Sequence, residues 1–108
     1  MHESDGRHEP RFASFDAFYP YYLGEHSDIR CRRMHFAGTA LVIATAFYAL
    51  TTTTWWALAL LPVFGYGFAW IGHFVFQRNR PATFQHPWYS IAGDFVMFRD
   101  ILVGKLQI

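Results

Sequence analysis

The middle of this sequence has no charged residue. Residues 34–76 contain no Asp, Glu, Lys or Arg, although charged residues make up 16 % of the chain. This run of 43 residues is about twice the ~20 residues that cross the core of a bilayer as a single helix. We therefore predict two membrane-spanning helices, at residues 35–50 and 57–76, folded together as a hairpin.

Cysteine and clustered charge are also scarce. Cys31 is the only cysteine, which excludes an internal disulfide and a cysteine-rich metal site. The net charge of +1 gives no clustered basic face, so we expect no nucleic-acid partner. Residues 1–11 are polar, unlike a secretory signal peptide. We expect them to form a disordered tail before a single membrane-embedded domain at residues 12–108, whose oligomeric state the sequence leaves open.

The turn and the orientation of the hairpin follow from a few residue types. Residues 51–54 are four threonines, and β-branched residues in a row propagate a helix poorly. Arginine flanks both ends of the apolar run, at Arg33, Arg78 and Arg80, and is absent from the turn. By the positive-inside rule, both termini are cytoplasmic. The prediction is a multi-pass integral protein of the bacterial inner membrane, or of the endoplasmic reticulum in a eukaryote.

Two amphipathic segments flank the hairpin. The N-terminal one, at residues 12–23, carries aromatic side chains at helical spacing, and we expect Pro20 to end or kink it. The C-terminal one, at residues 88–106, has an apolar stripe formed by Ile91, Phe95, Phe98 and Leu102. It carries too many charges to span, so we expect it to lie on the membrane or cover the cytoplasmic end of the hairpin. The predicted fold is an all-α membrane protein in which interfacial helices flank a two-span hairpin.

Two histidines interrupt the apolar run near its ends. Folding the run at its middle brings His35 and His73 to nearly the same depth, and ionisable residues inside a membrane are usually functional. Small residues precede His73 every four positions, and small residues also share the face of His35, which favours close helix packing. His26 and His86 lie in the adjoining loops. Neutral imidazoles bind iron, zinc, copper or nickel, with Glu25, Asp28 or Asp94 as possible carboxylate ligands.

The histidine pattern alone leaves other functions open. Two histidines on facing spans at equal depth also hold a b-type haem, which would indicate electron transfer. The histidines can instead be interfacial residues of a non-catalytic membrane adaptor.

Four segments resemble a known family of small membrane proteins. They are FYPYYLGEH at residues 18–26, RRMHFAGT at 32–39, YGFAWIGHFVFQRNRPATF at 66–84 and GDFVMFRDI at 93–101. This family, long known only as a domain of unknown function, has a characterised fungal member. That member is an iron(II)-dependent 2-hydroxy fatty acid dioxygenase of phytosphingosine α-oxidation. Members often have an acidic residue where this chain has Gln77.

The resemblance implies a cofactor, a reaction and a site. The family's histidines fall on His26, His35 and His73, which would bind Fe(II), with His86 as a further candidate. The substrates would be a 2-hydroxy fatty acid and O₂, and the acid would lose one carbon at the cytoplasmic membrane face. Arg33, Arg78 and Arg80 are candidates for binding the carboxylate of the substrate.

Overall fold

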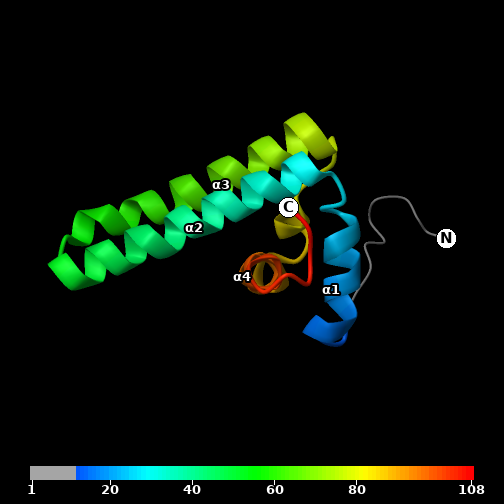
Figure 1. Ribbon diagram of the computed structural model, residues 1–108, viewed down its shortest axis with the longest axis horizontal. Coiled ribbons are helices and arrows are strands. Elements are labelled where there is room, and N and C mark those ends of the chain that lie inside the picture. Colours follow the sequence, from blue (N-terminus) through cyan, green and yellow to red (C-terminus); the bar gives the residue numbers. More distant parts are fainter. Residues whose placement is uncertain (1–11) are drawn as a thin grey trace.

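The structure is a computed structural model that describes residues 12–108; the tail expected at residues 1–11 lies outside the described residues. Residues 12–108 form helices and no strand, which confirms the predicted all-α class. The elements are α1 (Phe15–Gly24), α2 (Ile29–Thr52), the 3₁₀ helix η1 (Trp55–Ala59), α3 (Leu60–Ile71), the π-helix η2 (Gly72–Gln77), the 3₁₀ turn η3 (Ala82–Phe84) and α4 (Pro87–Leu102). Figure 1 shows a long arm made of α2 and α3, with α1 and α4 gathered at one end.

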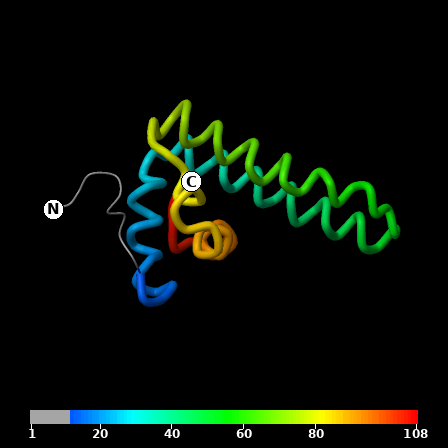
Figure 2. The backbone as a smooth tube through the Cα atoms, turned by 180° about the vertical axis from the view of Figure 1, so that it is seen from behind, coloured from blue at the N-terminus to red at the C-terminus, as the bar shows by residue number. Residues whose placement is uncertain are grey.

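The arm is the predicted hairpin. α2 and the continuous helix Trp55–Gln77 are both long and apolar enough to cross a membrane, and they lie side by side in both views (Figures 1 and 2). The chain reverses at Thr53, which is left-handed with φ 53°. The hydroxyl of Thr52 donates to the carbonyl oxygen of Tyr48 at 2.6 Å. The threonine run therefore contains the turn, as predicted.

α2 starts before the predicted span, because Asp28 caps it. The backbone N–H of Arg30 donates to the carboxylate of Asp28 at 2.8 Å, which satisfies one of the free N–H groups of the first turn. The helix therefore runs from Ile29 through His35 without interruption. Its first turn carries arginines, and its remainder carries the apolar span.

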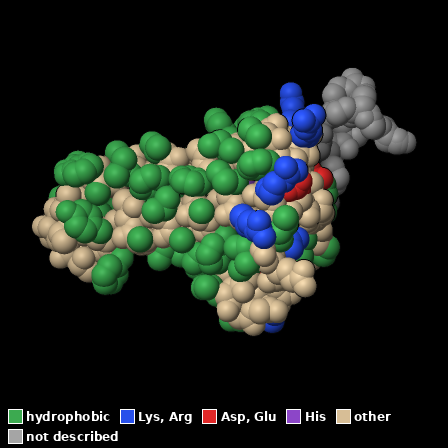
Figure 3. Space-filling view, turned by 45° about the horizontal axis from the view of Figure 1, so that its top comes forward, with side chains coloured by type: hydrophobic (Ala, Val, Ile, Leu, Met, Phe, Trp, Pro, Cys, Tyr) green, Lys and Arg blue, Asp and Glu red, His purple; other side chains and the backbone are tan. Residues whose placement is uncertain are grey.

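The surface of the arm is apolar. Figure 3 shows hydrophobic side chains along its whole length, whereas the Lys and Arg side chains of this face gather at one end. Only 22 % of the most apolar window of α2, and 11 % of that of residues 55–77, is buried. The core helices of a soluble protein are mostly buried. The exposed side chains include Phe47, Trp56 and Val63, so the arm has the surface expected of helices that face lipid.

The small core lies between α1, α4 and η3. Phe18, Tyr22, Met97 and Ala82 are buried together. We expected Pro20 to end or kink this helix; α1 continues past it to Gly24, so the helix does not end at the proline. Burial of Tyr22, which follows the proline, holds the second half of α1 in place.

α4 buries its small and polar face instead of its apolar stripe. Ser90, Gly93, Met97 and Asp100 point inward, whereas Ile91, Phe95 and Leu102 of the stripe are exposed. The fourth member of the stripe, Phe98, is half-buried and stacks on Phe36. A Cβ atom on Gly93 would lie 2.8 Å from the ring of Tyr22, so the absence of a side chain lets α1 and α4 approach closely. The exposed stripe suits the predicted position of α4 on a membrane surface.

Candidate metal centre

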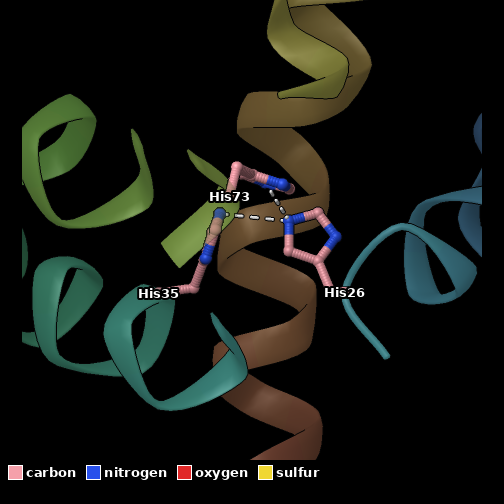
Figure 4. Close-up of side chains that lie close together, drawn as sticks. All are labelled: His26, His35 and His73. Atoms are coloured by element: carbon pink, nitrogen blue, oxygen red, sulfur yellow. Dashed lines mark hydrogen bonds between the residues drawn. The ribbon is translucent and has the colours of Figure 1, made fainter. Parts of the chain in front are cut away.

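Three histidines meet where α2, η2 and the loop after α1 come together. His26 follows the end of α1, His35 is in the second turn of α2, and His73 is in η2. The Nε2 atom of His26 lies 3.0 Å from Nε2 of His35 and 2.9 Å from Nε2 of His73. All three side chains are buried. Figure 4 shows the three rings pointing toward a common centre.

The other ring nitrogen of each histidine has an oxygen acceptor. Nδ1 of His26 lies 2.6 Å from the carbonyl oxygen of Tyr22, and Nδ1 of His35 lies 3.0 Å from that of Cys31. A carbonyl oxygen can only accept, so both Nδ1 atoms carry the proton and donate it. Each neutral ring therefore keeps a bare lone pair on Nε2.

Asn79 imposes the same tautomer on His73. Its Nδ2 donates to the carbonyl oxygen of Glu25 at 3.1 Å, which identifies Oδ1 as its acceptor atom. That oxygen lies 2.7 Å from Nδ1 of His73, which therefore donates to it. Metal-binding histidines almost always donate their second N–H in this way.

The three Nε2 atoms are therefore acceptors that face one another without a hydrogen between them. Such an arrangement is repulsive unless a cation lies at the centre. Two adjacent nitrogen ligands with metal bonds of about 2.1 Å at right angles stand about 3 Å apart, close to the separations of 2.9 Å and 3.0 Å found here. The donor set therefore fits a metal ion of the kind that imidazoles bind, iron included.

The π-helix η2 and two amides join His73 to the loop that carries His26. η2 spans Gly72–Gln77, and π-helical turns occur often at functional sites. Oε1 of Gln77 accepts from the backbone N–H of Asp28 at 2.7 Å, and its Nε2 donates to the hydroxyl of Ser27 at 2.8 Å. Asn79 contacts Glu25 in the same loop. Sequence reasoning missed both supporting roles; the nearest signal was the NRPAT segment, in which Asn79 follows His73 by six residues.

Burial shifts the pKa values of titratable groups at the site toward their uncharged forms. Burial lowers the pKa of His26 well below its usual value, and the nearby rings of His35 and His73 lower it further. His26 is therefore a neutral donor at pH 7, as a metal ligand must be. The ring of Tyr22 stacks on His26 at 4.0 Å and its hydroxyl donates to Asp94. Burial raises the pKa of Asp94 to about 7, although the hydrogen bond from Tyr22 favours its charged form.

Two cavities adjoin the histidines. The smaller, of about 10 Å³, is lined by all three histidines together with Tyr22, Ser90 and Asp94, among others. The larger, of about 200 Å³, lies between α2, α3 and α4 and is mostly apolar; its lining includes Val42, Leu61, Pro62, Gly65, Ile91 and Phe95. His35, Tyr66 and Asp94 line both. The candidate metal site therefore lies at the polar end of an apolar cavity.

The small-residue faces pack as the sequence suggested. A Cβ atom on Gly38 would lie 2.8 Å from Cβ of Phe68, and one on Gly65 would lie 3.5 Å from Val42. These contacts bring α2 and α3 together near the histidines, with the His35 and His73 rings 4.8 Å apart.

The remaining candidate residues lie away from the histidine cluster. His86 packs its ring against Phe12 and Phe18 instead of joining the other histidines. Arg33, Arg78 and Arg80 are exposed, and none of them lines either cavity beside the histidines. Asp28 caps α2, and the carboxylate of Glu25 accepts from Nδ2 of Asn79 at 3.3 Å. Of the three carboxylate candidates, only Asp94 lines the cavities beside the histidines.

Comparison with known proteins places the chain in a family. The model of the Mpo1-like family, described as 2-hydroxy-palmitic acid dioxygenase Mpo1-like, matches residues 12–106. No curated protein and no solved structure matches significantly.

Proposed function

The chain belongs to the Mpo1-like family, and from this premise we propose that it is an iron(II)-dependent dioxygenase of 2-hydroxy fatty acids. The observation that carries the proposal is the convergence of three buried Nε2 lone pairs, from His26, His35 and His73, beside an apolar cavity. The family name supplies the substrate class.

The reaction balances without a further reductant. A 2-hydroxy acid and O₂ give the acid shortened by one carbon, CO₂ and water, so the substrate itself supplies the four electrons that reduce O₂. The bond between C1 and C2 breaks. Bound iron would supply the redox and Lewis-acid chemistry that activates O₂ and the substrate. No 2-oxoglutarate is required.

The chain's own residues hold and enclose the reaction centre. His26, His35 and His73 would bind the metal, and the acceptors on their Nδ1 atoms fix the ring orientations. The burial of all three side chains excludes bulk water, which protects reactive species from side reactions.

A membrane location suits an amphiphilic substrate. The exposed apolar arm would insert in the bilayer, and the arginine-bearing end would face the cytoplasm. A fatty acid would then reach the cavity between α2, α3 and α4 from the lipid phase. Arg33, Arg78 and Arg80 would attract its carboxylate, or lipid phosphates, at the surface.

The structure gives less support to the haem alternative. The His35 and His73 rings are only 4.8 Å apart, and Nε2 of His26 fills the space beside them, within 3.0 Å of both Nε2 atoms. A porphyrin needs that space between its two axial ligands.

A turnover assay on the purified full chain tests the proposal. Protein reconstituted with Fe(II) in detergent should consume O₂ with 2-hydroxypalmitate, form pentadecanoic acid, and do neither with palmitate. Chelation of iron should abolish both signals. A Soret band in the purified protein would favour electron transfer instead. If His35→Ala and His73→Ala leave metal content and function unchanged, the protein is an adaptor and the proposal is wrong.

A further inference from the structure

One buried hydroxyl group beside the histidines has no partner. Ser90 is 2 % exposed, and its Oγ makes no hydrogen bond to any described residue. A serine in a helix can satisfy its hydroxyl on the carbonyl oxygen four residues earlier, but Ser90 does not. Leaving such a group unsatisfied is costly, so its persistence indicates a ligand. Of the three buried polar atoms without a partner in residues 12–108, only that of Ser90 belongs to a residue lining the histidine cavity.

Asp94 lies one helical turn further along α4 and has a free acceptor. Its Oδ1 accepts from the hydroxyl of Tyr22, and its Oδ2 has no hydrogen bond among the described residues. Asp94 lines both the histidine cavity and the apolar cavity. α4 therefore presents a donor and an acceptor, four residues apart, toward the three histidines.

The residues that α4 contributes to the two cavities are polar beside the histidines and apolar further away. Ser90 lines only the small cavity, Asp94 lines both, and Ile91 and Phe95 line only the apolar one. A 2-hydroxy fatty acid has the same order of groups: a carboxylate at C1, a hydroxyl at C2 and an alkyl chain from C3. The side chains of α4 therefore complement the groups of the substrate in the same order: a donor for the carboxylate, an acceptor for the hydroxyl and apolar residues for the chain.

We propose that Ser90 and Asp94 position the substrate. Ser90 donates to the carboxylate, Asp94 accepts from the 2-hydroxyl, and the first part of the alkyl chain occupies the cavity between α2, α3 and α4. The reacting C1–C2 bond then lies beside the three histidines. This inference rests on the proposed function and names which groups of the substrate are recognised.

Binding competition with three ligands separates the two roles. 2-Hydroxypalmitate carries both polar groups, palmitate lacks the hydroxyl, and hexadecane-1,2-diol lacks the carboxylate. Each would compete with tritiated 2-hydroxypalmitate for the full chain in lipid nanodiscs, loaded with Zn²⁺ so that no turnover occurs. Bound radioactivity gives the relative affinities.

Each variant should lose its preference for one group only. In Ser90→Ala the preference for 2-hydroxypalmitate over the diol should fall about tenfold, whereas the preference over palmitate remains. In Asp94→Asn the preference over palmitate should fall about tenfold, whereas the preference over the diol remains. Asn can still accept from Tyr22, so the contact between α1 and α4 is retained.

Asp100→Asn is the matched control. Asp100 also lies on α4 and accepts from a tyrosine of α1, Tyr19, at 2.8 Å, but it lines neither of these cavities. Its substitution should change neither preference. Zinc content should equal that of wild type in every variant, and Ser90→Ala should be no less stable, because it removes an unsatisfied hydroxyl.

The outcomes distinguish this inference from the proposed function. If Ser90→Ala and Asp94→Asn keep both preferences while wild type turns over 2-hydroxypalmitate, the positioning roles are wrong and the activity stands. If wild type neither prefers nor consumes the hydroxy acid, the proposed function fails first. If Asp94→Asn loses zinc, the decision rests on Ser90→Ala alone. A fall in its preference for 2-hydroxypalmitate over the diol supports the proposal, and an unchanged preference contradicts it.

Discussion

The arm and the head of this molecule are built in opposite ways. The outer part of the arm, residues 40–68, buries only Ala49 and Ala57, and many of its large apolar side chains are exposed. The head, which comprises α1, its following loop, the start of α2, η2 and α4, buries three histidines, Ser90 and Asp100. Lipid would solvate the first region, whereas a small aromatic core and hydrogen bonds organise the second. The difference implies that the exposed apolar surface and the candidate metal centre depend on separate sets of residues.

Substitutions in the two regions should differ most in their effect on metal content. His73→Ala removes one of three converging donors and should abolish stoichiometric iron, as His26→Ala and His35→Ala should. Trp56→Ala, at the exposed tip of the arm, should keep full iron. Elemental analysis of protein purified from membranes measures both. Iron retained in all three histidine variants would show that the cluster is structural.

A smaller effect should follow from loss of the amide that orients His73. Asn79→Ala removes the acceptor at 2.7 Å from Nδ1. Loss of such a partner typically lowers metal affinity about 10-fold to 100-fold. Competition with a chelator of known affinity measures the change. Gln85→Ala, an exposed amide in the following loop, should leave the affinity unaltered, and an equal loss in both variants would contradict the orienting role.

Glycine substitutions test where close helix packing matters. In Gly38→Ala the new methyl group would lie 2.8 Å from Cβ of Phe68 and 3.0 Å from the carbonyl oxygen of Phe64, which must move apart. We expect a loss of about 1 to 3 kcal/mol in the free energy of unfolding. Gly67→Ala meets nothing within 4 Å and should be neutral or slightly stabilising. Unfolding in detergent mixtures measures both, and equal stabilities would refute the packing argument.

The hairpin was predictable because the charge-free segment that indicates it is long. A charge-free run of this length, with threonines at its middle, has few alternatives to two packed apolar helices, and the structure has them. His35 and His73 were predictable as neighbours for the same reason. The place of His26 depended on the family resemblance, because the fold of a loop has no periodicity that can be recognised in a sequence.

Other features of the head were not predictable from local patterns. The π-helix at Gly72–Gln77 shifts the hydrogen-bond register and brings Asn79 to His73, and nothing in the residue spacing indicates it. In α4, the apolar stripe predicted a position on the membrane or over the end of the hairpin, but it did not indicate which residues of the opposite face are buried. The structure buries Ser90 and Gly93, because small residues permit close approach while apolar ones can face lipid.

The two tyrosine–aspartate pairs that join α1 to α4 should differ in how the stability they contribute depends on pH. Burial raises the pKa of Asp94 to about 7 from its usual value of 3.8. Between about pH 4 and pH 7 the folded protein therefore keeps a proton that the unfolded chain has lost. Raising the pH favours the unfolded chain, by at most about 1.4 kcal/mol per pH unit. Below pH 4 and above pH 7 this dependence vanishes.

Subtraction of a variant isolates this effect from the histidines. The free energy of unfolding of wild type minus that of Asp94→Asn should fall as the pH rises from 4.5 to 7.5, because both proteins share every other titrating group. Burial raises the pKa of Asp100, but hydrogen bonds from Tyr19 and Arg99 outweigh it, so the pKa lies below its usual value. Its stabilisation is lost only below about pH 4, so wild type minus Asp100→Asn should be flat over the same range. Parallel slopes for the two pairs would mean that Asp94 is as well solvated as an ordinary surface carboxylate, and that the polar end of the apolar cavity is open to water.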